Sequence, residues 1–154
     1  MKQKVRPNFW KKFPLSELNP SEWEMLCDGC GKCCLIKLEN KDTTKIHYTN
    51  IACHLFDDKN CKCSNYQNRK KVVNNCLVLT HQSLKNAYRW MPNTCAYRLL
   101  YENKELKPWH HLISGSKESV HNAKMSVRNS TMSENNIPEK MWQDYITNDY
   151  SSLT

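Results

Sequence analysis

The chain has 154 residues with a formal net charge of +8, and 39% of its residues are hydrophobic. This length suits one domain over residues 1–154, and the hydrophobic share lies below the roughly 45–50% of ordinary soluble domains, so the core must be lean. No run of about 18 apolar residues occurs, and the N-terminus lacks the apolar segment of a secretion signal, which excludes membrane and exported proteins and predicts a cytoplasmic one.

Residues 1–13 form a predicted basic arm that two aromatic side chains, Phe9 and Trp10, anchor. The first predicted helix begins at residues 19–22, Asn-Pro-Ser-Glu, because this order provides an N-cap, a first-turn proline and a capping-box glutamate. Helical spacing then places four side chains on one face, namely Trp23, Leu26, Cys27 and Cys30. We therefore expect this helix to deliver the first cysteines.

The motif CDGCGKCC occupies residues 27–34. A CxxC turn brings two thiolates to one metal, and glycines let the backbone approach the sulfurs closely; two of the chain's three glycines, Gly29 and Gly31, lie here. Adjacent Cys33 and Cys34 suit a multi-iron cluster or two nearby metals better than one mononuclear ion. The motif therefore favours an iron–sulfur cluster over zinc and leaves both open.

Residues 35–40 and 45–56 carry aliphatic and β-branched side chains around a polar turn, which predicts a β-hairpin leading to a second cysteine group. An odd total of nine cysteines in a cytoplasmic chain indicates metal ligation rather than disulfides. The loop around Cys61 is expected to close on the first motif, although Cys61 and Cys95 also suit small buried hydrophobes. The candidate ligands are Cys27, Cys30, Cys33, Cys34, Cys53, Cys61, Cys63, Cys76 and Cys95.

Further helices are predicted near Asn65–Lys71, Leu79–Tyr88, Thr94–Glu102, Ser116–Lys124 and Pro138–Ile146, with residues 107–111 as a packed loop. The last helix is expected to be anchored by Met141, Trp142, Tyr145 and Ile146. The fold class that follows is α+β and helix-rich, a single small domain with one β-hairpin and irregular cysteine-rich metal-binding loops.

Tyr66 and Arg69 are candidate cofactor-binding residues, because Cys63, Tyr66 and Arg69 share one face if residues 65–71 are helical. Arg69 would donate hydrogen bonds to a metal-bound thiolate or an anionic ligand. The alternative is an arginine paired with a carboxylate beside a core tyrosine. The six histidines are weaker ligand candidates, and Asp28 is expected to be a solvated acid.

These motifs identify the chain as similar to the YcgN-type bacterial proteins, within the wider YkgJ-like group described as a zinc- or iron-chelating domain. The wider group has CxxCxxCC, a later cysteine that matches Cys53, and a C-x-[IV]-Y-x-x-R-P-x-x-C segment. Residues 63–76 match this segment at Cys63, Tyr66, Arg69 and Cys76, and they depart from it by asparagine at position 65, lysine in place of the proline, and a longer gap to Cys76. The YcgN-type likeness extends from there through residues 95–100 and 108–117. The resemblance implies metal binding but no particular reaction. A further likeness to part of the flagellin lysine methylases implies an iron–sulfur cluster.

Three classes of function remain open on this reading: a metal-binding protein, an iron–sulfur enzyme of group transfer or redox chemistry, and a metal-stapled RNA- or protein-binding module. A centre with four thiolates adds negative charge, so the scattered basic residues fit a surface that screens this centre better than a nucleic-acid footprint. The sequence predicts a metal ion or cluster as partner, no membrane, and no particular oligomeric state.

Overall fold

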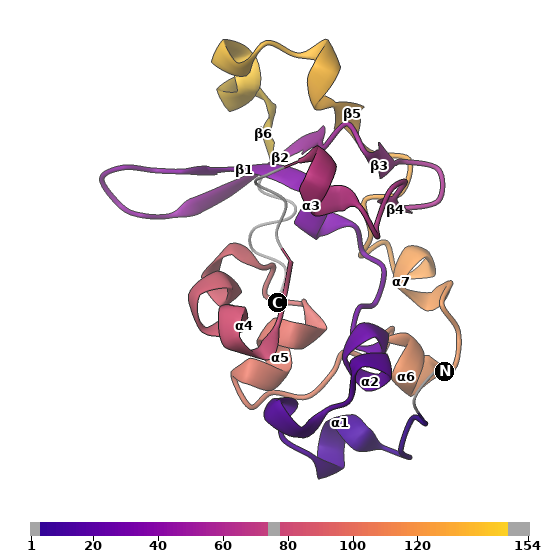
Figure 1. Ribbon diagram of the computed structural model, residues 1–154. Coiled ribbons are helices and arrows are strands. Elements are labelled where there is room, and N and C mark those ends of the chain that lie inside the picture. Colours follow the sequence, from indigo (N-terminus) through magenta and orange to yellow (C-terminus); the bar gives the residue numbers. More distant parts are fainter. Residues whose placement is uncertain (1–3, 74–77, 148–154) are drawn as a thin grey trace.

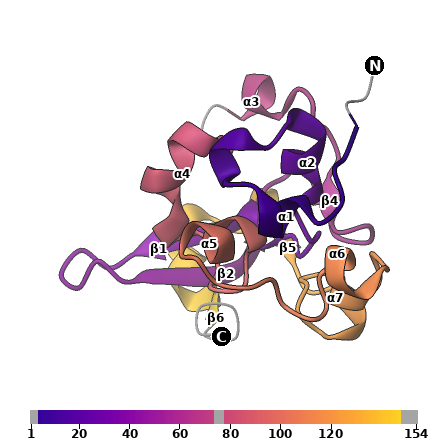
Figure 2. The ribbon, with the colours of Figure 1, turned by 90° about the horizontal axis from the view of Figure 1, so that it is seen from below.

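The computed structural model describes residues 4–73 and 78–147 and shows a small α+β domain with short helices and much irregular chain. Figure 1 shows two halves, with the sheets in one and most of the helices in the other. The cysteine motif crosses between them, because it links the end of helix α2 (Pro20–Met25) to the start of strand β1 (Leu35–Glu39). Figure 2, which views the molecule from below, shows most of the helices in front of the sheet.

The sheet half is built on the predicted hairpin, in which β1 pairs antiparallel with strand β2 (Ile46–Ala52). Strand β2 also pairs in parallel with β5 (Met132–Ser133) and antiparallel with β6 (Ile146–Thr147). A separate two-stranded sheet joins β3 (Phe56–Asp57) to β4 (Lys62–Cys63). The core cluster of the sheet half contains Leu35, Tyr48, Ala52, Cys61 and Val127.

The helical half has a larger core, in which Phe9, Leu26 and Leu84 are fully buried. Phe9 and the partly buried Trp10 confirm the predicted aromatic anchor of the N-terminal arm. None of the described helices exceeds seven residues, and none is long and apolar enough to cross a membrane. The α-helices besides α2 are α1 (Phe9–Lys12), α3 (Arg69–Val72), α4 (His81–Ala87), α5 (Ala96–Tyr101), α6 (His111–Ser114) and α7 (Ser119–Asn122).

The predicted start of the first helix is confirmed, because Asn19 caps α2 and forms a capping box with Glu22. The prediction that this helix carries the first cysteines is wrong, since α2 ends at Met25. The Asp28 side chain accepts a hydrogen bond from the backbone N–H of Cys30 at 3.0 Å. Gly29 adopts a φ of +83°, which a continuing helix does not allow.

Two further helix predictions need correction. Residues 65–68 precede α3, so Cys63 in β4, Tyr66 in a turn and Arg69 at the start of α3 do not share one helical face. The segment Glu139–Tyr145 is a 3₁₀ helix, η5, and Met141 is 41% exposed, so it does not act as an anchor. Short 3₁₀ segments have poor hydrogen-bond geometry and depend on their context, which sequence periodicity does not report.

Candidate metal centre

The loop of residues 27–34 is shaped by its glycines and by Asp28. Gly31 has a φ of +77°, and a Cβ atom added there would lie 2.8 Å from Cys61 Sγ and 2.9 Å from Phe56 Cζ. Only glycine therefore fits where this loop touches the sheet half. Asp28 is not simply a solvated acid as expected, because its Oδ1 accepts the Cys30 N–H and sets the turn.

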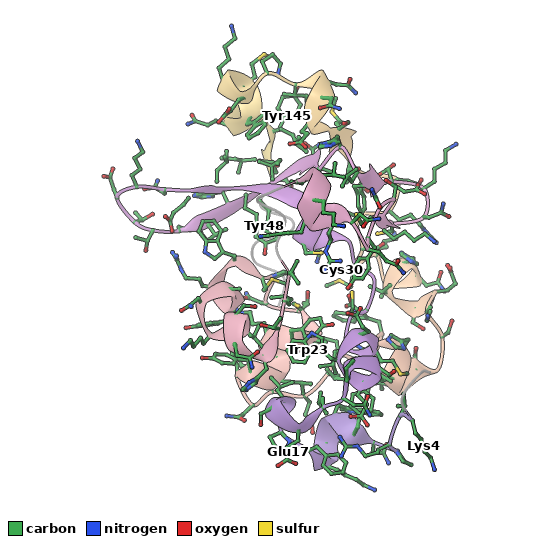
Figure 3. All side chains as sticks on the ribbon, viewed as in Figure 1. Lys4, Glu17, Trp23, Cys30, Tyr48 and Tyr145 are labelled. Atoms are coloured by element: carbon green, nitrogen blue, oxygen red, sulfur yellow. The ribbon has the colours of Figure 1, made fainter. Side chains whose placement is uncertain are left out.

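Four thiols lie close enough to this turn to interact electrostatically with Asp28. Cys27, Cys30 and Cys33 belong to the loop, whereas Cys95 is distant in sequence and is the N-cap residue of α5. Each of them interacts electrostatically with Asp28, and burial raises the pKa of Cys27 and Cys30 and brings that of Cys95 to about 12. Cys27 retains an exposed edge, but its thiol lies among the other sulfurs. Figure 3 shows Cys30 between Tyr48 of the sheet half and Trp23 of the helical half.

Cys33 and Cys34 belong to different neighbourhoods although they are adjacent. Their thiols contact each other, and the hydrogen bond from Cys34 lowers the pKa of Cys33 while raising its own. Cys63 and Cys53 lie near enough to Cys34 to contribute to the raised pKa of its thiol. The backbone supports this grouping, because the N–H of Cys53 donates to the carbonyl of Cys34 at 2.9 Å. The adjacent cysteines therefore lie between the first thiol group and the thiols of Cys53 and Cys63.

Cys61 is placed differently. It is 4% exposed, belongs to the core cluster of the sheet half, and its Sγ donates to the carbonyl of Cys30 at 3.4 Å. Burial raises its pKa to about 11. The loop that carries Cys61 does close on the first motif, as expected, but its thiol points at a backbone carbonyl. Cys76 falls at residues 74–77, outside the described part of the chain.

Two lysines lie among the thiols. Lys32 is fully buried and interacts with Cys30, Asp28 and Cys95. Lys37 donates from Nζ to the carbonyls of Cys33 and Leu35 at 3.2 and 3.0 Å. Burial lowers the pKa of both lysines, and the neighbouring sulfurs oppose this shift. Buried ammonium groups are retained where negative charge compensates them, as thiolates bound to a metal would.

A stacked histidine pair holds the chain just before the motif. The rings of His110 and His111 lie 4.5 Å apart, and their Nε2–H groups donate to the carbonyls of Leu26 and Met25, both at 2.8 Å. His110 Nδ1 accepts the N–H of Leu112, which fixes the neutral tautomer, and burial lowers the pKa of His110. These histidines position the chain that leads to Cys27, a role that the sequence did not reveal.

Tyr66 and Arg69 stack on each other at the surface, with the guanidinium 3.8 Å from the ring centroid. The Tyr66 hydroxyl donates to Glu24 at 2.8 Å, and Arg69 donates to the carbonyl of Tyr66. Burial, the bond to Glu24 and the nearby Cys27 together raise the pKa of Tyr66 to about 12. Tyr66 therefore lies close to the first thiol group, and it is 48% exposed rather than part of the core.

Comparison with known proteins places the cysteine motif in a family. Residues 26–96 match the family model CxxCxxCC, described as a "Putative zinc- or iron-chelating domain". A UPF0260 protein of Rhodobacter capsulatus is 54% identical over 97% of this chain and 99% of its own length. The chain belongs to the UPF0260 family. UPF0260 proteins of Pseudomonas syringae and Pseudomonas aeruginosa are 46% and 45% identical, each over 95% of this chain and 97% of theirs. No solved structure matches.

The matched domain of this UPF0260 protein begins at Leu26 and ends at Ala96. It therefore contains the whole of the first thiol group, from Cys27 to Cys95, together with Lys32 and Lys37. It ends before the histidine pair and before β5, which come from the C-terminal part of the UPF0260 chain. The comparison supports metal chelation by a cysteine motif, zinc or iron, and does not distinguish the two.

Proposed function

We propose that this chain is a metal-binding protein whose principal centre is held by Cys27, Cys30, Cys33 and Cys95. The observation that carries the proposal is the arrival of Cys95, from the N-terminus of α5, beside three cysteines of one loop. Sulfur ligands that are distant in sequence and meet around one turn are the arrangement that thiolate-bound metals need.

The residues present fit such a centre chemically. Four thiolates select zinc or iron–sulfur chemistry, and the buried Lys32 supplies a positive charge that an anionic centre would balance. The bound metal would supply structural cross-linking or, as a cluster, one-electron chemistry. Glu22 and Arg6 fix α2 ahead of the motif, and the histidine pair fixes its end, so the protein orients the ligands from both sides.

An iron–sulfur cluster is the form that we favour. A single zinc ion with Zn–S bonds of about 2.3 Å holds its sulfurs about 3.8 Å apart. Among the described residues, only Cys53, His54 and Glu134 form a trio of candidate donors within 4.8 Å of one another. The adjacent Cys33 and Cys34, which one mononuclear ion would accommodate poorly, support the larger cluster. Cys34, Cys53 and Cys63 form a neighbouring thiol group.

A catalytic use of the centre is the second candidate function, and Tyr66 and Arg69 favour it. A half-exposed tyrosine within electrostatic range of Cys27, with an arginine stacked on its ring, offers a hydroxyl and a cation on the side of the proposed centre. Such groups would bind an anionic small molecule. We infer a cytoplasmic setting from the free thiols, and the finer assignment to the YcgN type rests on the sequence resemblance.

The test is anaerobic purification followed by metal analysis and a visible absorption spectrum. We expect a coloured protein with iron and sulfide, and loss of that iron in Cys30→Ala. A colourless chain that contains one zinc ion, and that loses this ion in the Cys30→Ala variant, would mean that the centre holds zinc and not a cluster. A chain without either metal would overturn the proposal.

A further inference from the structure

A second group of metal-binding side chains lies outside the motif, at one edge of the main sheet. One donor atom each from Cys53, His54 and Glu134 lies within 4.8 Å of the other two. We propose that these three side chains form a separate site for a borderline divalent metal ion, such as Zn²⁺ or Co²⁺. The proposal does not depend on which metal occupies the principal centre.

The strand pairing explains why these residues meet. β2 and β5 run parallel in the register Ile51↔Met132 and Ala52↔Ser133. Both strands therefore end at the same edge of the sheet, and the next residues along each chain are Cys53 with His54 on one side and Glu134 on the other. Side chains that follow parallel strands converge at the carboxyl edge of a sheet, where ligands bind in many folds.

The backbone on both sides is fixed before any metal arrives. Cys53 donates from its N–H to Cys34 at 2.9 Å and accepts from the N–H of Phe56 at 2.8 Å. On the other side, Ser133 caps the 3₁₀ helix η4 (Glu134–Asn136), so Glu134 leaves the strand at a defined angle. Ligands held by two anchored segments lose little further conformational entropy on binding, which is the usual basis of a preorganised site.

His54 and Glu134 already contact each other. The Nδ1–H and the backbone N–H of His54 both donate to Oε1 of Glu134, at 2.7 and 3.1 Å. The side chains are 34% and 22% exposed, so an ion can enter from solvent. An exposed pair of this kind adds little to stability, so these two side chains can turn to a metal ion at little cost to the fold.

The donor set defines the ion. One thiolate, one imidazole and one carboxylate suit borderline first-row ions, whereas Mg²⁺ and Ca²⁺ take oxygen ligands. The two anionic donors neutralise a divalent ion, so this site is neutral where the four-thiolate centre is anionic. Three protein ligands leave at least one position of a four-coordinate ion for water or a small ligand.

The experiment uses the full chain, purified anaerobically with its principal centre loaded, and titrates it with Co²⁺. We expect one further Co²⁺ to bind with a thiolate-to-cobalt absorption band. Cys53→Ala should abolish the band, and His54→Gln and Glu134→Gln should each weaken binding by about tenfold or more. The iron or zinc of the principal centre should be unchanged in all three variants, which separates this test from that of the proposed function.

Two matched variants serve as controls. Glu118→Gln removes another exposed glutamate, paired with Arg128 at 3.1 Å, and His121→Gln removes a histidine bonded to Ser126. Both should bind Co²⁺ as the wild type does. The proposal is overturned if His54→Gln and Glu134→Gln, shown to be folded by circular dichroism, bind Co²⁺ with wild-type affinity. It is also overturned if Cys30→Ala abolishes Co²⁺ binding while the three proposed ligand variants retain it.

Discussion

The two halves of this protein are stabilised in different ways. The helical half has the larger hydrophobic core, with Phe9, Leu26 and Leu84 at full burial and many partly buried side chains around it. The sheet half has a core cluster of only five buried residues, one of them a cysteine. Each half is too small to fold alone on burial of apolar surface, because small cores offset little of the conformational entropy.

This difference between the cores indicates where a metal centre would contribute most to stability. The principal thiol group takes Cys95 from the helical half and Cys27, Cys30 and Cys33 from the segment that joins the halves. Among the described residues, hydrogen bonds also cross between the halves, for example from the Tyr48 hydroxyl to the carbonyl of Trp90 at 2.7 Å and from Arg89 to Glu39 at 2.6 Å. A metal at this place would join two weak cores into one cooperative unit, and small domains with lean cores use such cross-links.

Removal of the metal should have the largest effect. Stripping the principal centre with a chelator should cost about 5 kcal/mol or more, because ligand binding and folding are coupled. For a chain of this size that lowers the thermal midpoint by roughly 10 °C or more. Differential scanning calorimetry before and after chelation measures it. An unchanged midpoint with the metal gone would show that the two cores suffice.

Truncation of a core leucine should lower the unfolding free energy by different amounts in the two halves. Leu26→Ala in the helical core and Leu35→Ala in the sheet core remove the same atoms from positions that are 0% and 4% exposed. We expect losses in unfolding free energy of about 2–5 kcal/mol, with Leu26→Ala at the upper end because more side chains surround it. Urea unfolding of the metal-loaded variants tests this order. Equal losses would contradict the difference between the cores.

Acid should weaken the helical half through Glu22. Hydrogen bonds from Arg6 lower the pKa of this buried carboxylate from 4.5 to about 2. A lowered folded-state pKa contributes stability that is fully present above about pH 4.5 and is lost as the pH falls through about 2. Glu22→Gln should cost about 2 kcal/mol near neutral pH, with Arg6 over one-third exposed, and the cost should shrink towards pH 2.

The control for this prediction is Glu105→Gln, at an exposed position of the same half. Unfolding free energies from pH 2 to 7 for both variants give the comparison. A Glu22→Gln cost that stays constant across this range would mean that the carboxylate charge is not what stabilises α2.

A helix cap should give the smallest effect. The Thr80 hydroxyl oxygen accepts the N–H of Ser83 at 3.1 Å, and the backbone N–H of Thr80 donates to the Ser83 hydroxyl oxygen at 2.9 Å, which completes a capping box for α4. Thr80→Ala should cost about 1 kcal/mol. Gln82→Ala, on the exposed face of the same helix, is the matched control and should be close to neutral. Urea midpoints distinguish the two.

Local signals in the sequence were enough for several elements. The capping box at Asn19 predicted α2, and the aliphatic and β-branched residues around a polar turn predicted the β1–β2 pair, because both signals depend on neighbouring residues. The end of α2 was missed, since the Asp28 turn competes with helix continuation at a point where spacing alone looked helical. The 3₁₀ character of η5 depends on tertiary context and leaves no periodic signal.

For the site, the residue pattern predicted a class of chemistry but not the grouping of the ligands. Cysteine spacing indicated metal ligation, and adjacent Cys33 and Cys34 favoured a multi-iron cluster or two nearby metals. Which distant partners join them depends on tertiary packing, so the pairing of Cys95 with the first motif could not be read from spacing. Glu134 was missed entirely, because only the parallel β2–β5 register brings it to His54, 80 residues away.

The most direct test of the central claim compares Cys95→Ala with Cys61→Ala. Both thiols are buried, and burial raises both pKa values, to about 12 and about 11, so loss of packing alone affects them similarly. Metal content per folded chain after anaerobic purification is the measurement. We predict that Cys95→Ala loses the metal of the principal centre and that Cys61→Ala retains it. Full metal retention in Cys95→Ala would contradict the account.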